Sequence, residues 1–272
     1  MIDNLRFEIS FKNILQLEKK LEFCASNNID KINIPCKGLI KKQFLNEIIE
    51  YIGKNHKGLD VIYHYSLYHQ YSKNRNFSYL ELLKFIKKCN SYNNYEILLV
   101  SGTNKKKNFE VMGVMYDLKK EKNLNTNIGI AYNPYLENYY DIYGERERFQ
   151  KKFSMGLTKS IWLQFGTDIP LLEAEINYLK KYICNDSLNL KDQKVKVFGS
   201  LLIPSRQFIS RFKFRPWKGV YISEKYLYSL ESFNEFIKDL LELYLEYNIY
   251  PIIETECSTF EQLEKINTLF KN

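Results

Sequence analysis

Short apolar runs alternate with amphipathic stretches along the whole chain, and this alternation limits the possible folds more than any other feature. Eight runs have the length and composition of strands: Leu5–Ile9, Lys31–Ile34, Leu59–Tyr63, Glu96–Val100, Asn127–Ala131, Ser160–Gln164, Lys194–Leu201 and Tyr250–Glu254. Strands separated by helices predict a parallel sheet, and eight is the number that closes an α/β barrel. A doubly wound open sheet is the main alternative, but no glycine-rich phosphate turn follows the first run. We therefore expect a single-domain (β/α)8 TIM barrel over residues 1–272.

The stretches between the runs carry apolar residues at helical spacing. The clearest are Asn13–Asn28, Ser78–Asn90, Ile169–Ile183 and Ser232–Asn248. Ser78 stands three residues before Glu81, the spacing of a capping box, and Asp168 precedes a helix that Pro170 opens. Both residues are therefore predicted N-caps.

Composition indicates an ordinary globular chain. Hydrophobic residues make up 45% of the sequence, and no apolar run approaches the ~20 residues needed to cross a membrane. The amino-terminal segment enters the first strand almost at once, so we expect no signal peptide. Five scattered cysteines without a CxxC pair argue against a zinc site or a disulfide framework. We expect no metal site and a cytoplasmic location.

The net charge of +8 suggests nucleic-acid binding at first sight. Much of the basic excess is lysine on helices that also carry glutamate, so a solvated helical face explains it better. We expect neither nucleic acid nor a membrane as partner, and the sequence leaves a homo-oligomer open.

Polar residues stand at the ends of several predicted strands, where parallel barrels carry their active sites. Glu8 lies inside an apolar strand, and a buried carboxylate is costly unless it is paired or protonated. It is either a general acid with a raised pKa or a member of a buried ion pair. His64 ends the third predicted strand, and its imidazole either contacts a ligand or makes a structural hydrogen bond.

Two further positions have a functional and a structural interpretation. Gln164 ends a very apolar strand, where its amide either orients a heterocyclic ligand or bridges neighbouring strands. Arg148 and Lys152 lie four residues apart on the helix after Tyr132, so they share one face. That face either meets a phosphate or is solvated.

Taken in order, these segments resemble the methylenetetrahydrofolate reductases, flavin-dependent (β/α)8 barrels of one-carbon metabolism and methionine biosynthesis. FEIS (7–10) resembles the first-strand signature of that family, and IAYNPY with KKFSMG resembles its flavin-binding strand and helix. IWLQFGTD resembles the folate-contacting strand, and GSLLIPS (199–205) resembles a segment of the seventh strand. The order and spacing of the motifs carry the resemblance over most of the chain.

The resemblance implies an enzyme in which NAD(P)H reduces FAD, and FAD then reduces 5,10-methylenetetrahydrofolate to 5-methyltetrahydrofolate. Glu8 matches the catalytic acid that protonates the folate ring nitrogen, and Gln164 matches the residue that contacts the pterin. The cofactor-binding positions implied are His64, Gly102, Tyr132, Glu145 and Lys152. The preference for NADH or NADPH stays open.

Departures from the family favour a second interpretation. Thr103 and Asn104 stand where the fourth strand of the family has an aspartate near flavin and folate. Phe11 and Lys12 replace its paired prolines. The chain is therefore either a divergent reductase or a folate- or flavin-binding barrel that has lost or changed the activity.

The segment 211–227 has no clear counterpart in the family. It is either a lid, with Arg215 and Lys218 near a polyglutamate tail, or a closing loop with Trp217 packed inside.

Overall fold

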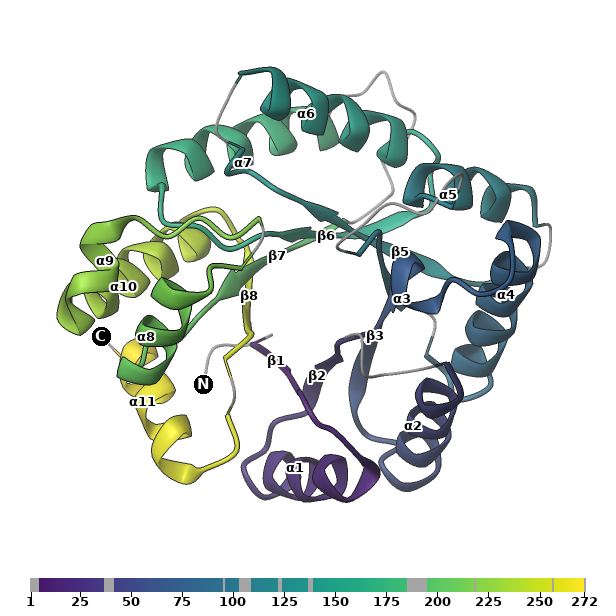
Figure 1. Ribbon diagram of the computed structural model, residues 1–272, viewed down its shortest axis with the longest axis horizontal. Coiled ribbons are helices and arrows are strands. Elements are labelled where there is room, and N and C mark those ends of the chain that lie inside the picture. The colour runs from purple at the N-terminus through teal and green to yellow at the C-terminus, as the bar shows by residue number, and fades with distance from the viewer. Residues whose placement is uncertain are drawn as a thin grey trace. The chain divides into compact units, whose positions relative to one another are not determined.

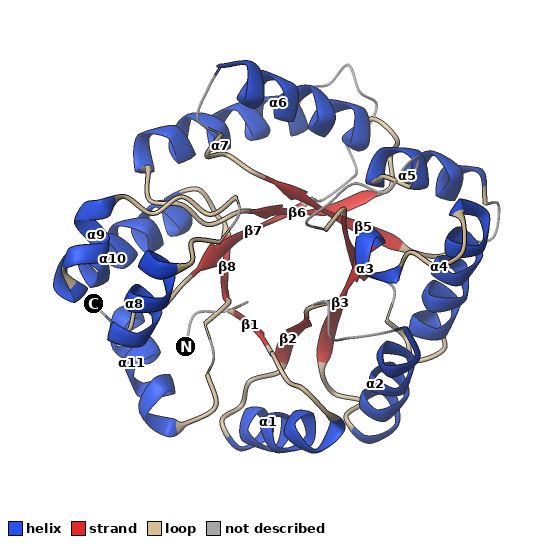
Figure 2. Ribbon diagram, viewed as in Figure 1, coloured by secondary structure: helices blue, strands red, loops and turns tan. Residues whose placement is uncertain are grey.

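The computed structural model describes residues 5–36, 42–94, 96–102, 109–121, 124–136, 139–184, 195–217, 219–255 and 257–271. Eight parallel strands form a closed barrel in the order of the sequence, with helices between them (Figures 1 and 2). The strands are β1 (Arg6–Glu8), β2 (Lys31–Ile34), β3 (Asp60–Ser66), β4 (Glu96–Val100), β5 (Asn127–Tyr132), β6 (Thr158–Leu163), β7 (Lys196–Leu201) and β8 (Tyr250–Ile253). The predicted (β/α)8 barrel is confirmed.

Eleven helices are described, and most of them connect one strand to the next. They are α1 (Ile14–Ser26), α2 (Lys42–Asn55), α3 (Leu67–Gln70), α4 (Arg75–Asn90), α5 (Val111–Lys120), α6 (Tyr139–Phe153), α7 (Ile169–Ile183), α8 (Arg206–Phe214), α9 (Glu224–Tyr228), α10 (Leu230–Glu246) and α11 (Phe260–Lys271). Within the described ranges, none has the length and apolar content to cross a membrane.

The two predicted N-caps have different outcomes. Asp168 caps α7 as expected, because its carboxylate accepts a hydrogen bond from the Leu171 amide at 3.0 Å. The prediction for Ser78 is wrong. Asn74 caps α4, and Ser78 lies within the first turn, where its hydroxyl donates to the carbonyls of Ser72 and Asn74.

The chain divides into two compact units. One unit comprises Phe7–Ala131 and Gln150–Lys159. In this unit Tyr63 and Tyr65 pack against Phe85 of α4, so they face the helix layer. Since side chains alternate along a strand, His64 between them faces the barrel interior.

The other unit comprises Met1–Arg6, Tyr132–Phe149 and Ser160–Asn272. Here Trp162 of β6 stacks on Phe198 of β7 with ring centroids 4.1 Å apart. Phe165 contacts Phe233 and Phe236 of α10 on the helix side. The alternation of β6 therefore places Trp162 and Gln164 on the interior side.

Candidate functional site

Three side chains in the carboxyl-terminal halves of β1, β2 and β3 form a polar cluster, which we call the Glu8 cluster: Glu8, Asn33 and His64. The prediction that His64 ends its strand is wrong, because β3 continues to Ser66. Glu8 pairs in register with Asn33, so the two side chains share a face of the sheet. The Asn33 amide nitrogen lies 2.9 Å from Nε2 of His64, and Nδ1 of His64 lies 4.0 Å from a carboxylate oxygen of Glu8. Side-chain exposure is only 10% for Glu8 and 13% for His64, and Asn33 is fully buried. The cluster brings together two predicted site residues, Glu8 and His64.

Sequence reasoning missed Asn33. The signal was present, because an asparagine between two isoleucines in a short apolar strand must find a buried partner for its amide. What the sequence did not show was that the partner is His64 on the next strand.

Gly102 follows β4 with a φ of +88°, a backbone conformation that favours glycine. A Cβ atom at this position would lie 2.6 Å from Cβ of Tyr68 and 2.8 Å from the hydroxyl of Ser66. The space beside Gly102 is therefore occupied by neighbouring protein atoms. Thr103 and Asn104, which stand in place of the family aspartate, lie outside the described residues.

Tyr132 lies on the helix side of β5, and not at the rim where we expected it. Its ring packs against Phe149 of α6, and its hydroxyl donates to the carboxylate of Glu175 on α7. Arg146 reaches the same carboxylate through two nitrogens, one of them at 3.1 Å. Burial and the hydrogen bond to Glu175 raise the pKa of the Tyr132 hydroxyl well above its usual value. The alternation of side chains along a strand explains this difference from the prediction, because the side chains on either side of Tyr132 point to the opposite face of the sheet.

The charged side chains of α6 that were expected near a cofactor bind other protein groups. Glu145 is buried and accepts hydrogen bonds from the backbone amide of Asn133 at 3.2 Å and from Arg148 at 2.9 Å. Lys152 is also buried, and its ammonium donates to the carbonyl of Ala131 at 3.1 Å. Arg148 and Lys152 therefore have separate protein acceptors, and a shared phosphate-binding face stays a prediction.

Gln164 follows β6, and its backbone amide donates to the carbonyl of Tyr132 at 2.9 Å. Its side-chain amide makes no hydrogen bond to any residue that the structure describes, and the residue is partly exposed. An amide that makes no side-chain hydrogen bond within the described part of the chain is suited to contact a heterocycle. The bridging alternative for the Gln164 side chain finds no support among the described residues.

The polar groups predicted to hold FAD are largely engaged within the protein. Tyr132 binds Glu175, Glu145 binds Asn133 and Arg148, Lys152 binds Ala131, and Nε2 of His64 faces Asn33. These residues do not fit a flavin in the way that the resemblance implies. We therefore assign no step of a reaction to FAD. Among the described residues, no group of three metal-binding side chains is present either.

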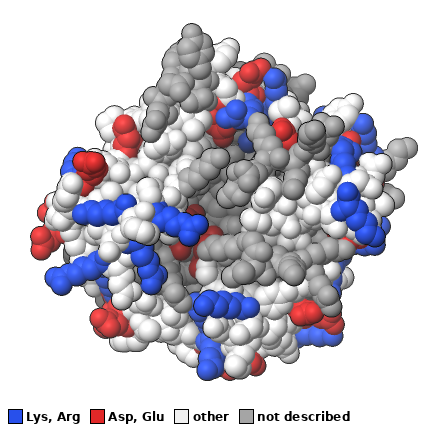
Figure 3. All heavy atoms as spheres, viewed as in Figure 1, with Lys and Arg blue, Asp and Glu red and all other residues white. Residues whose placement is uncertain are grey.

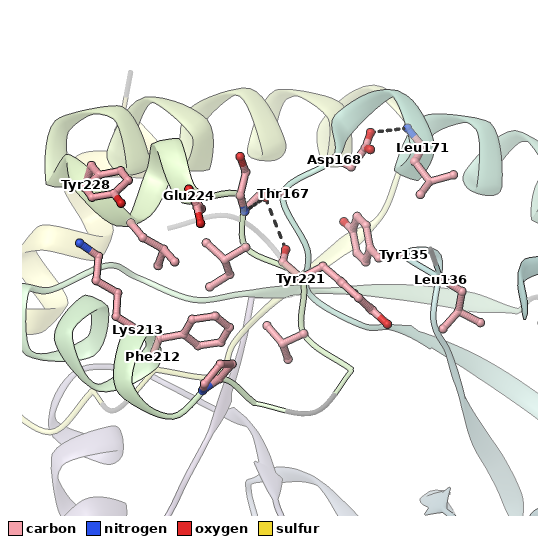
Figure 4. Close-up of a pocket in the computed structure, with 15 residues that line it drawn as sticks. Tyr135, Leu136, Thr167, Asp168, Leu171, Phe212, Lys213, Tyr221, Glu224 and Tyr228 are labelled. Carbon is pink, nitrogen blue, oxygen red and sulfur yellow. Dashed lines mark hydrogen bonds between the residues drawn. The ribbon is translucent and has the colours of Figure 1, made fainter. Parts of the chain in front are cut away.

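The segment 211–227 lines a cavity of about 730 Å³ at the loops that follow β5, β6 and β7 (Figure 4). The backbone of Tyr221 forms a parallel bridge to Gly166, and the Thr167 hydroxyl accepts a hydrogen bond from the Ser223 amide at 2.8 Å. The walls are mainly apolar and aromatic, and Lys213, Asp168 and Glu224 carry opposite charges around them. The described residues of the segment thus form part of the wall of this cavity.

Trp217 does not pack inside the barrel-closing loop as one alternative required. Its ring contacts Phe208 and Phe212 edge-on, and 48% of the residue is exposed. Lys218 lies outside the described residues. Over α8–α10, on the left of Figure 3, lysine and arginine side chains lie beside aspartate and glutamate, which is the mixed surface expected of solvated helices.

Comparison with known proteins supports the fold alone. No family model and no curated protein matches the chain. The catalytic domain of a hyperthermophilic chitinase from Pyrococcus furiosus is similar in structure, with a TM-score of 0.55 and 12% identity over 93% of this chain and 84% of that chain. An aldose reductase from Schistosoma japonicum has a TM-score of 0.48 and 10% identity over 100% of this chain and 84% of that chain, which is too weak to carry an argument.

Proposed function

We propose that this chain is a reductase of the methylenetetrahydrofolate type, in which Glu8 is the acid that protonates the substrate. The observation that carries the proposal is a nearly buried carboxylate at the end of β1, 4.0 Å from an imidazole nitrogen. The carboxyl ends of barrel strands are where such enzymes place their chemistry. The order of the resembling motifs, on β1, β5, β6 and β7 of one barrel, also supports it.

Reduction of a methylene bridge between two nitrogens requires a hydride on the carbon and a proton on the nitrogen that leaves it. In this proposal a reduced nicotinamide is the source of the hydride. Glu8 donates the proton to the ring nitrogen and becomes a carboxylate. Gln164 contacts the edge of the heterocycle through its side-chain amide.

A Glu8→Gln variant tests the role of the acid, because glutamine keeps the shape of the side chain but cannot donate a proton as the acid does. Loss of a general acid typically costs about 10²–10⁴-fold in rate. We expect a loss of that size in the rate at which 5,10-methylenetetrahydrofolate is reduced to 5-methyltetrahydrofolate with NADH or NADPH under anaerobic conditions. Calorimetry should show that binding of 5,10-methylenetetrahydrofolate is unchanged. The matched control is Glu22→Gln, on the exposed face of α1 in the same unit. A Glu8→Gln enzyme as active as the control would remove Glu8 from the mechanism.

A second candidate is a folate-binding barrel without reductase activity. It is favoured by the internal bonding of Tyr132, Glu145 and Lys152, which removes polar contacts that a flavin reductase would use. The wild-type protein distinguishes the two candidates. Binding of methylenetetrahydrofolate without turnover, with or without added FAD, favours the second candidate, and the absence of binding rejects both.

A further inference from the structure

We propose that Asn33 is a positioning residue, which fixes the ring of His64 so that its Nδ1–H points at the carboxylate of Glu8. The inference rests on the proposed function, since it assigns Asn33 and His64 to the environment of the proposed acid. It is argued from the Glu8 cluster, whose three members lie in one compact unit.

The identity of the Asn33 atom decides which ring nitrogen carries the proton. The side-chain nitrogen of Asn33 faces Nε2 of His64 at 2.9 Å. An amide nitrogen is a donor only, so Nε2 must accept the hydrogen bond. A neutral imidazole that accepts at Nε2 carries its proton on Nδ1, and Nδ1 is the nitrogen that lies 4.0 Å from Glu8.

The strands hold this arrangement in place. Asn33 is fully buried on β2, and its neighbour in register on β1 is Glu8. His64 is anchored on β3, where the flanking Tyr63 and Tyr65 both pack against Phe85 of α4. A buried amide cannot give up its partner without a cost in desolvation, so the orientation of the imidazole is a property of the folded barrel.

The consequence concerns the charge that forms when Glu8 loses its proton. The proton moves from the carboxyl oxygen to the substrate nitrogen, and a carboxylate remains. An N–H directed at that carboxylate stabilises it through a charge-assisted hydrogen bond once the two groups approach from 4.0 Å. No proton leaves His64 in this step. Asn33 therefore acts on Glu8 through His64 and touches no reacting atom.

The tautomer is measurable without any substrate. The chain has three histidines, so 15N-histidine labelling and long-range proton–nitrogen correlation spectra give few signals, and His64→Gln identifies those of His64. We expect the wild-type protein to show the Nδ1–H tautomer at His64. In Asn33→Asp the carboxylate is an acceptor, so the proton of His64 should be found on Nε2.

The matched control is Asn13→Asp, which makes the same change at an exposed N-cap in the same unit. Aspartate is as good an N-cap as asparagine, so the spectrum of His64 should be unchanged. A wild-type His64 protonated at Nε2, or one with averaged nitrogen signals, would overturn the inference even if Asn33→Asp failed to fold.

Turnover separates this inference from the proposed function. If the chain reduces methylenetetrahydrofolate, Asn33→Asp should lower kcat about tenfold, the effect of losing one well-placed hydrogen bond, and leave KM unchanged. An unchanged kcat with the expected tautomers would reject the effect on Glu8. Absence of turnover in the wild type, with the Nδ1–H tautomer present, would reject the proposed function and leave the positioning by Asn33 standing.

Discussion

Replacing Arg146 by methionine should destabilise the protein strongly, because the buried carboxylate of Glu175, on the helix side of β5, then loses its cationic partner. Glu175 is only 1% exposed, and Arg146 supplies two of the nitrogens that hold its carboxylate. Removing one partner of a buried ion pair typically costs about 3–5 kcal/mol. Since the Arg146 side chain is 35% exposed, solvent screens part of its interaction with Glu175. We therefore expect the loss of the ion pair to lower the free energy of unfolding by about 2–3 kcal/mol.

A second contact adds to this cost. The Arg146 guanidinium lies 4.5 Å from the ring centroid of Tyr178, and loss of such a cation–π contact at a partly exposed site costs roughly 0.5–1 kcal/mol. The expected total is about 3 kcal/mol. For a chain of this size that corresponds to a fall in Tm of about 6–12 °C.

Urea denaturation followed by tryptophan fluorescence measures the free energy of unfolding, and Trp162 and Trp217 are the reporters. Lys54→Met is the matched control, because it removes a cation from the exposed pair with Glu50, and we expect no measurable change. The double variant Arg146→Met, Glu175→Met should recover part of the loss, since the unpaired carboxylate is then gone. The reasoning is refuted if Arg146→Met is no less stable than the control, or if the two losses simply add.

Further predictions concern a turn, a phenol and two thiols. Gly102→Ala should lower the free energy of unfolding by about 1–3 kcal/mol, since φ is +88° and the new Cβ meets occupied space; Gly113→Ala, in a helix with open space around it, should raise it by roughly 0.5–1 kcal/mol. Tyr132 has a pKa raised in the folded state, so its contribution to stability is complete below about pH 10 and falls as the pH rises further. Unfolding measured between pH 9 and 11 should show a shallower decline for Tyr132→Phe than for the wild type, and an equal slope would contradict the assignment. Exposed Cys184 should react with Ellman's reagent in the native protein, whereas burial that raises the pKa of Cys89 should delay its reaction until unfolding; mass mapping of the modified thiols checks both.

The pattern of strands was predictable because it depends on local burial. The bounds of β2 and β4 are those expected from the sequence, as are those of α7, which has both an N-cap and a first-turn proline. A helix end is harder to locate when several candidates compete. At α4, Asn74 is the cap although Ser78 had the better-known spacing, because the hydroxyl of Ser78 is used by backbone carbonyls instead.

The site was only partly predictable, because membership in it depends on partners far along the chain. Glu8 and His64 were identified by their positions at the ends of predicted strands, and the structure brings them together although β3 continues to Ser66. Tyr132 also carries a polar group at the end of a strand. The partner of its hydroxyl, however, is Glu175, which lies 43 residues further along the chain on α7. No local pattern distinguishes a tyrosine that faces the barrel interior from one that faces the helix layer, since a shift of one residue reverses the face.

The wall formed by the segment after β7 is attached to a different strand from the one that leads into it. Thr167, in the loop after β6, accepts a hydrogen bond from Ser223 and donates one to the carbonyl of Tyr221 at 3.4 Å. The segment is therefore held to the loop after β6 at Tyr221 and Ser223. Substitutions of lining side chains such as Phe212, Val220 and Ile222 would reshape the cavity while the barrel and its strand register stay the same. In evolutionary terms, this is a position where ligand preference can diverge at small cost in foldability.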